Sequence, residues 1–147
     1  INLRPPFDDA VLVADSARGV DLLKLNDEEL LPVAIALGNE AARVAAEKCG
    51  ASGVTAEMVA KAAAAIGQAA KASVVVVTRG AAGAVVWDSA AEDEAWSCAG
   101  FRAPNVLDSV GAGDGFLAAL LATRLQTGGS SWSEALEVGC RVGAFVA

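Results

Sequence analysis

Histidine and tyrosine are absent from this chain of 147 residues, and cysteine occurs only three times. Without histidine, and with no two cysteines close in sequence, a zinc site is not expected. The number of cysteines is odd, and no CxxC spacing occurs among Cys49, Cys98 and Cys140. This usage is typical of small apolar side chains kept reduced in the cytoplasm, so we expect a cytoplasmic location.

Positive charge is also scarce, because 11 Lys and Arg face 18 Asp and Glu and the net charge is -7. This balance argues against nucleic acid or an anionic membrane as a partner. It leaves a phosphorylated small molecule open, since such a site needs only local positive potential. No apolar run is long enough to span a bilayer, and no basic, apolar leader precedes the domain.

What the chain has in quantity is small and apolar side chains. Hydrophobic residues make up 54% and charged residues 20%, which fits a globular domain with a real core. Ala and Gly are abundant, and small side chains let helices pack closely on a sheet. Without internal repeats or a low-complexity linker, we expect one α/β domain.

Helical patterns alternate with short apolar strands along the chain. Residues 74–77 are four consecutive valines, a pattern typical of a strand buried on both faces of a parallel sheet. The alternation predicts a mainly parallel sheet flanked by helices. Strands are expected over 20–25, 73–78, 84–87 and 95–98, and helices over 8–18, 26–37, 39–49, from Thr55 as N-cap, over 116–125, and after Ser133 as N-cap.

The most informative stretch is glycine-rich and runs from Asp108 to Phe116, DSVGAGDGF. Gly111 and Gly113 allow a tight turn and close approach of a ligand to the backbone. The N–H groups and the dipole of the helix that follows favour an anion. Asp114 would repel a bound phosphate, so its better use is as a base that takes a proton from a hydroxyl. The ordinary alternative is a turn with an acid favoured by the helix dipole.

Two other phosphate-binding patterns do not fit. A Rossmann fingerprint would need Gly where Phe116 stands, and no GxxxxGK[ST] sequence occurs. Residues 108–114 instead resemble the D-[ST]-x-G-A-G-D signature of the PfkB/ribokinase family of carbohydrate kinases. The resemblance implies that Asp114 is the catalytic base and that the backbone of Gly111, Ala112, Gly113 and Asp114 holds the γ-phosphate of ATP. It also places Asp108 and Ser109 where many members hold a monovalent cation such as K⁺.

Residues 24–29 resemble the N-x-x-E motif of that family. The resemblance implies that Asn26 contacts the nucleotide phosphates and that Glu29 places Mg²⁺. Magnesium keeps several waters and is held through few carboxylates, so this small donor set is reasonable. The alternative is a helix capping box, with Asn26 as the cap and Glu29 closing it at the third helical position.

Three weaker resemblances follow the same order as in the family. Residues 74–83 resemble its strand and T-x-G-x-x-G stretch, which implies that Thr78, Gly80 and Gly83 line the nucleotide; the alternative is an ordinary strand and turn. The last helix resembles the adenine-side helix, but Cys140 stands where Asn is common and cannot supply an amide hydrogen bond. Residues 2–6 resemble a segment of fructokinases and ketodeoxygluconate kinases, which implies that Asn2 and Arg4 face the sugar.

The resemblance implies a ribokinase-like α/β fold, of which residues 1–147 are the C-terminal, nucleotide-binding part without the β lid. The implied reaction is ATP- and Mg²⁺-dependent phosphorylation of a primary hydroxyl on a sugar or sugar-like substrate. We expect the fragment alone to be inactive. Dimers of the family usually pair through the lid, so the resemblance leaves a homodimer of the full-length protein open. The alternatives are a non-catalytic or truncated nucleotide-binding module, and a structural α/β domain that binds nothing.

Overall fold

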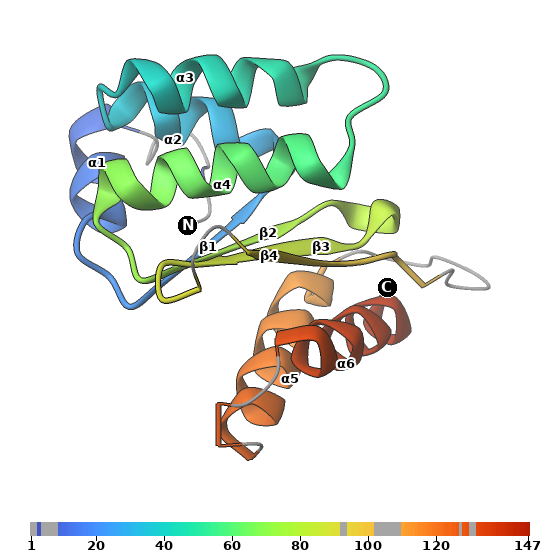
Figure 1. The fold of residues 1–147 in the computed structure, drawn as a ribbon. Coiled ribbons are helices and arrows are strands. Elements are labelled where there is room, and N and C mark those ends of the chain that lie inside the picture. The colour runs from blue at the N-terminus through green and yellow to red at the C-terminus, as the bar shows by residue number, and fades with distance from the viewer. Residues whose placement is uncertain (1–2, 4–8, 92–93, 102–109, 127, 130–131) are drawn as a thin grey trace. The chain divides into compact units, whose positions relative to one another are not determined.

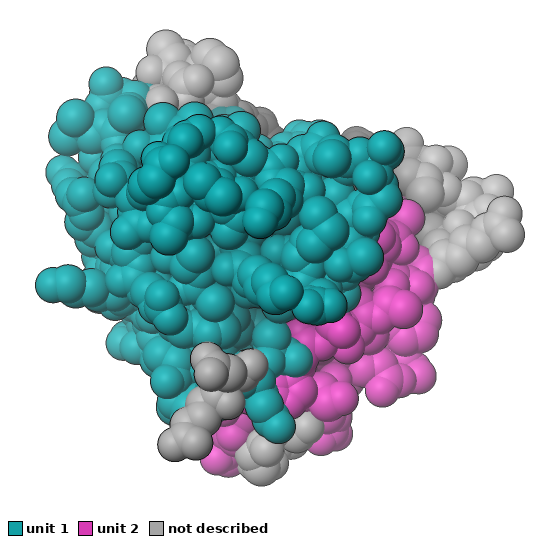
Figure 2. Space-filling view, turned by 45° about the horizontal axis from the view of Figure 1, so that its top comes forward, with its two compact units in different colours: residues 1–77, 86–95 teal, residues 78–85, 96–147 magenta. Residues whose placement is uncertain are grey.

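The computed structural model describes Leu3 and residues 9–91, 94–101, 110–126, 128–129 and 132–147. The chain divides into two compact units, coloured separately in Figure 2. Unit 1 comprises residues 1–77 and 86–95, and unit 2 comprises residues 78–85 and 96–147. Among the described residues, none of the helices combines the length and the apolarity needed to cross a membrane.

Four strands form one mixed sheet in the order β1-β2-β3-β4. The helices α2, α3 and α4 lie in the chain between β1 and β2, which is the long crossover that a parallel pair needs. The links from β2 to β3 and from β3 to β4 are too short for a crossover, and this makes the sheet mixed. The α/β class predicted from the sequence is confirmed, with strands β1 (Leu22–Asn26), β2 (Val74–Thr78), β3 (Ala84–Asp88) and β4 (Ala95–Cys98).

The helices of unit 1 lie on one side of β1 and β2 (Figure 1). The elements are α1 (Ala10–Ala17), the 3₁₀ turn η1 (Asp27–Glu29), α2 (Leu30–Ala36), α3 (Glu40–Glu47), the 3₁₀ turn η2 (Lys48–Gly50) and α4 (Ala56–Ala70). Local caps set their starts. The Asp9 carboxylate accepts from the backbone N–H of Val11 at 2.9 Å, and the Thr55 hydroxyl accepts from that of Met58 at 3.2 Å. The predicted cap at Thr55 is therefore confirmed, and Asp9 caps the helix that was predicted over 8–18.

The core of unit 1 is aliphatic. The central valines of the predicted run, Val75, Val76 and Val77, are fully buried, as are Leu25 and Ile66. Trp87 closes one side of this core against Gly67, where a Cβ atom would stand 2.2 Å from the indole ring. Small residues thus allow α4 to approach its neighbours closely, as the composition predicted.

Unit 2 contains the turn after β2, with its 3₁₀ segment η3 (Gly80–Ala82), and the two helices α5 (Ala112–Gln126) and α6 (Trp132–Val146). The helices pack against each other (Figure 1), because glycines on α6 let the backbones approach. A Cβ atom on Gly139 would lie 3.1 Å from the Phe116 ring, and one on Gly143 would lie 3.3 Å from the carbonyl oxygen of Ala112.

Two predicted helix starts were wrong. Helix α5 begins at Ala112 rather than Phe116, because the N–H of Gly115 donates to the carbonyl of Gly111 at 2.8 Å and closes a first turn there. Asp114 therefore lies in that first turn and not in a loop. Helix α6 begins at Trp132, so Ser133 is inside the helix and is not its cap.

Candidate functional site

Unit 2 contains a pocket of about 390 Å³. This is within the size range of small-ligand sites, which is roughly 300–1,000 Å³. The residues that line it are Thr78, Gly80, Ala81, Gly83, Gly100, Phe101, Ala112, Gly113, Phe116, Cys140, Gly143, Ala144 and Ala147. The wall is therefore built from the turn after β2, the segment after β4 and the two packed helices.

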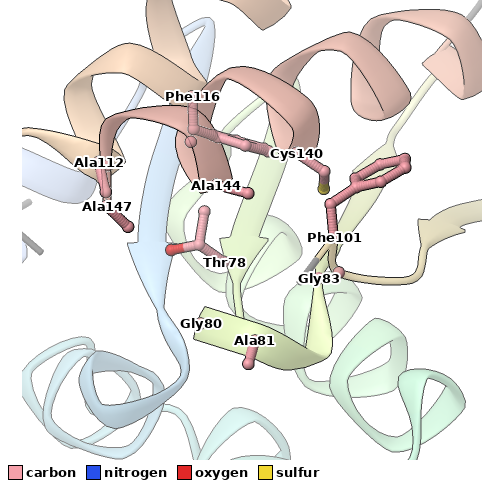
Figure 3. A pocket seen from close by; sticks show the side chains of 13 residues that line it. Thr78, Gly80, Ala81, Gly83, Phe101, Ala112, Phe116, Cys140, Ala144 and Ala147 are labelled. Atoms are coloured by element: carbon pink, nitrogen blue, oxygen red, sulfur yellow. The ribbon is translucent and has the colours of Figure 1, made fainter. Parts of the chain in front are cut away.

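The two ends of this pocket are lined by different residues (Figure 3). Phe101 and Cys140 lie at one end, which we call the apolar end, and Ala112 and Ala147 lie at the other, which we call the helix end. The Thr78 side chain lies between the two ends, with its hydroxyl oxygen turned toward the helix end. A ligand with an apolar ring at one extremity and a polar group at the other would match this arrangement.

The helix end is formed by the N-terminus of the 15-residue helix α5. The N–H of Gly115 donates to the carbonyl of Gly111 and closes the first turn, so the amides of Ala112, Gly113 and Asp114 precede the intrahelical ladder. Gly111 has a positive φ of 84°, which turns the chain into the helix. Ala112 and Gly113 line the pocket, so this end carries the partial positive charge that favours an anion.

Asp114 directly follows these lining residues. It is the acidic residue of the first turn of α5, and its side chain is exposed. A buried carboxylate enclosed in packed protein would have excluded the predicted role of a base. An exposed carboxylate beside an anion site is free to accept a proton from a bound hydroxyl.

The wall opposite the helices depends on close backbone contact. The N–H of Arg79 donates to the carbonyl of Gly83 at 2.7 Å. Gly83 has φ 94°, and a Cβ atom there would stand 2.0 Å from the carbonyl oxygen of Cys98. On the facing segment, a Cβ atom on Gly100 would stand 2.1 Å from the carbonyl oxygen of Ala81. Only glycine fits at these two positions.

The apolar end is closed by two neighbouring residues of α6. The Arg141 guanidinium carbon lies 5.2 Å from the centroid of the Phe101 ring, within the range of a cation–π contact. Burial, and then contact with Cys98, raise the pKa of the Cys140 thiol to about 12. The thiol is therefore neutral at physiological pH, and this end of the pocket carries no negative charge from Cys140.

Asn26 and Glu29 lie in unit 1 and form the capping box that the sequence allowed. The Glu29 N–H donates to Asn26 Oδ1 at 2.8 Å, and the Asn26 N–H donates to Glu29 Oε2 at 2.8 Å. The other carboxylate oxygen of Glu29, which is only 5% exposed, accepts from the N–H of Leu3 at 3.0 Å. The described residues contain no group of three or more potential metal ligands.

The structure thus gathers part of the predicted site. Thr78, Gly80, Gly83 and Cys140 line one pocket together with Ala112 and Gly113. Gly111 and Asp114 are next to it in the chain but do not line it. The predicted residues Asn2, Arg4, Asp108 and Ser109 lie outside the described residues.

Sequence reasoning missed several residues of this wall. Cys140 is joined by Gly143 and Ala144 of α6 and by Ala147 directly after it, at steps of three, four and seven residues. That spacing places them on one helix face, so the helical period after Cys140 was a usable signal. Gly100 and Phe101 had no comparable signal, because only their packing against α6 and the turn after β2 brings them to the pocket.

The fold and the pocket define the class of protein as a ribokinase-like α/β protein. A family model for "pfkB family carbohydrate kinase" matches residues 1–147. The chain therefore belongs to the pfkB family of carbohydrate kinases. No curated protein matched the chain.

Solved structures show the same fold. The PfkB protein from Polaromonas sp. JS666 is 28% identical over 97% of this chain and 39% of its own, with a TM-score of 0.63. Phosphofructokinase-2 from Escherichia coli with fructose-6-phosphate is 24% identical over 92% of this chain and 38% of its own (TM-score 0.61). Aminoimidazole riboside kinase from Salmonella enterica, complexed with aminoimidazole riboside and an ATP analogue, is 22% identical over 100% of this chain and 44% of its own (TM-score 0.67). The chain thus spans about two fifths of these proteins.

Proposed function

We propose that the protein to which this chain belongs transfers the γ-phosphoryl group of ATP to a primary hydroxyl of a sugar or sugar-like substrate. Residues 1–147 supply the C-terminal, nucleotide-binding part of a single kinase domain. The observation that carries the proposal is the pocket of unit 2, in which the N-terminal amides of a long helix form one end and apolar side chains form the other.

ATP fits this pocket in one direction. The base takes the apolar end, beside Phe101 and Cys140, where a flat ring replaces water against apolar atoms. The phosphates take the helix end, which Ala112 and Gly113 line and where their amides precede the intrahelical ladder. Gly80 and Gly83 leave the room that the nucleotide needs, and the Thr78 hydroxyl bonds the ribose or a phosphate.

The chemistry then follows from charge and proton balance. The substrate hydroxyl oxygen attacks the γ-phosphorus, the bond from that phosphorus to the β–γ bridging oxygen breaks, and ADP leaves. Asp114 accepts the hydroxyl proton. The amides of Gly111, Ala112, Gly113 and Asp114 stabilise the negative charge that spreads over the phosphoryl oxygens during transfer.

The cations and the sugar complete the proposal. Glu29 is an oxygen donor of the kind that Mg²⁺ takes, and each carboxylate oxygen has lone pairs beyond the one used by its N–H donor. Asn26 is assigned to the phosphates, Asp108 and Ser109 to K⁺, and Asn2 and Arg4 to the sugar. Bound Mg²⁺ would neutralise phosphate charge.

Fructose or a keto-deoxy sugar acid is the first substrate to test, and a cytoplasmic homodimer is the predicted state of the full-length protein.

Glu29 can be tested apart from the reaction itself. In Glu29→Gln, one backbone N–H that the carboxylate now binds would face the amide nitrogen of Gln, which is a donor. Leaving this partly buried N–H unsatisfied should lower the free energy of unfolding by about 1–3 kcal/mol. We further expect the Mg²⁺ concentration for half-maximal activity to rise. The control is Glu28→Gln, one residue earlier and exposed. If only stability changes, Glu29 is a capping residue and not a magnesium ligand.

The function is tested with the full-length protein, ATP, Mg²⁺ and a panel of fructose, 2-keto-3-deoxygluconate and ribose. We expect ADP release together with a phosphate ester at a primary carbon, identified by phosphorus NMR. Binding of a non-hydrolysable ATP analogue without phosphorylation of any sugar would favour the non-catalytic module. Absence of nucleotide binding would leave the structural α/β domain.

A further inference from the structure

Two cysteine side chains meet at the apolar end of the pocket. Cys140, on α6, is 7% exposed and lines the pocket, while Cys98, the last residue of β4, is half-buried. Burial, and then the nearby Cys98 side chain, raise the pKa of the Cys140 thiol. The Cys98 thiol in turn donates to the carbonyl of Ala99 at 3.2 Å. The two cysteine side chains are therefore neighbours, although 42 positions (140 − 98) separate them in the chain.

Backbone and ring contacts hold the same two segments together independently of the thiols. Arg141, next to Cys140, stacks over Phe101, three residues after Cys98. The carbonyl of Cys98 lies against Gly83, which lines the same pocket as Cys140. The proximity of the two cysteines therefore follows from the packing of the strand end on α6, and not from one side-chain torsion.

We propose that Cys98 and Cys140 are a disulfide-forming pair, oxidised by hydroperoxides, and that the bond between them restricts the apolar end of the nucleotide pocket. A disulfide needs sulfur atoms about 2.0 Å apart and Cβ atoms about 3.5–4.5 Å apart. Because the end of β4 already packs against Gly83 and, through Phe101, against Arg141 of α6, a small closure of the strand end on the helix would reach that geometry.

The oxidation balances with a hydroperoxide as the two-electron acceptor. The half-buried Cys98 sulfur attacks the O–O bond of hydrogen peroxide, forms an S–O bond and releases one water. The Cys140 sulfur then attacks the Cys98 sulfur, the S–O bond breaks, and the departing oxygen leaves as a second water with the proton of the Cys140 thiol. Two thiols and one peroxide thus give one disulfide and two waters.

The third cysteine provides an internal comparison. Cys49 lies in unit 1, and its thiol donates to the carbonyl of Ala45 at 3.6 Å. Trypsin separates all three cysteines, because Cys49 falls in peptide 49–61, Cys98 in peptide 80–102 and Cys140 in peptide 125–141. A disulfide can therefore be assigned by mass spectrometry without ambiguity.

The bond itself is tested by treating the full-length protein with hydrogen peroxide, blocking free thiols and digesting without reductant. We expect peptides 80–102 and 125–141 to be linked, and the link to disappear in Cys98→Ser. Cys49→Ser should form it as the wild type does. Recovery of both peptides as free thiols or sulfinic acids, or linked to other cysteines, would overturn the proposal.

The effect on nucleotide rests on the proposed function, whereas the formation of the bond does not. The bridge draws the segment that carries Phe101 toward α6, so we expect an ATP analogue to bind roughly 10- to 100-fold more weakly, a loss of about 1.4–2.8 kcal/mol. Dithiothreitol should restore binding, and Cys98→Ser should be unaffected by peroxide. Unchanged affinity in the linked protein would refute the restriction. If the reduced protein binds no nucleotide, the proposed function fails. The mass spectrometry of the linked peptides still shows in that case whether the disulfide forms.

Discussion

Asp114→Asn is expected to lower the kcat of the full-length enzyme by roughly 10²- to 10⁴-fold, the range that a positioned base contributes. Asparagine keeps the size of the side chain but cannot take the proton of the attacking hydroxyl. The backbone amides of the helix end remain in place, so the affinity for an ATP analogue should change little. The measurements are kcat at saturating sugar and ATP, and the Kd of the analogue by calorimetry.

A matched control is Glu134→Gln, which removes the acid in the first turn of α6 instead of α5. An acid in the first turn stabilises a helix by about 0.3–1 kcal/mol through the helix dipole. Losing that stabilisation should therefore have a similar, small effect in the two variants. A large loss of kcat is expected only for Asp114. Near-normal turnover of Asp114→Asn would remove the base assignment, and an equal loss in both variants would point to the helix dipole.

Gly83→Ala is expected to lower the free energy of unfolding by about 3 kcal/mol or more and to abolish nucleotide binding. Alanine at φ 94° is strained, and its Cβ atom would stand 2.0 Å from the backbone oxygen of Cys98. Because the obstacle is backbone, the turn must move away from the end of β4. That movement opens the wall of the pocket. Urea denaturation and analogue binding measure the two effects.

Gly53→Ala separates the two causes of this loss. Gly53 also has a positive φ, 84°, but a Cβ atom there would meet nothing within 4 Å. We expect this control to lose only the conformational part, about 1–2 kcal/mol, and to bind nucleotide normally. If Gly83→Ala proves no more harmful than Gly53→Ala, the close contact with Cys98 does not shape the pocket.

Much of the local structure could be predicted from the residues alone. The cap at Thr55 was correct because a cap bonds an amide two or three residues away. The valine run was correctly predicted as a buried strand because its composition suits nothing else. The start of α5 was wrong because two glycines suggested a loop, whereas packing against α6 holds them in a helical turn.

In the candidate site, too, the residues that a local motif groups could be predicted, and those that tertiary contacts bring together could not. Thr78, Gly80 and Gly83 share one turn, so a short motif was enough to group them. For Glu29, the sequence allowed two roles, a residue of a capping box or a ligand of Mg²⁺, and did not decide between them. The structure confirms the capping box and adds the hydrogen bond from Leu3, a residue 26 positions away, which no local pattern could indicate.

The amino-acid sequence by itself determined the order of helices and strands, the family motif around Asp114 and the glycines of the turn after β2. These depend on hydrogen bonds and side-chain periods that span only a few residues. Only the tertiary structure decided that Phe101 and Gly100 complete the pocket, that Cys98 contacts Cys140 and that Gly83 tolerates no side chain. Those outcomes depend on how closely separate segments approach, which is set by packing across the whole of unit 2.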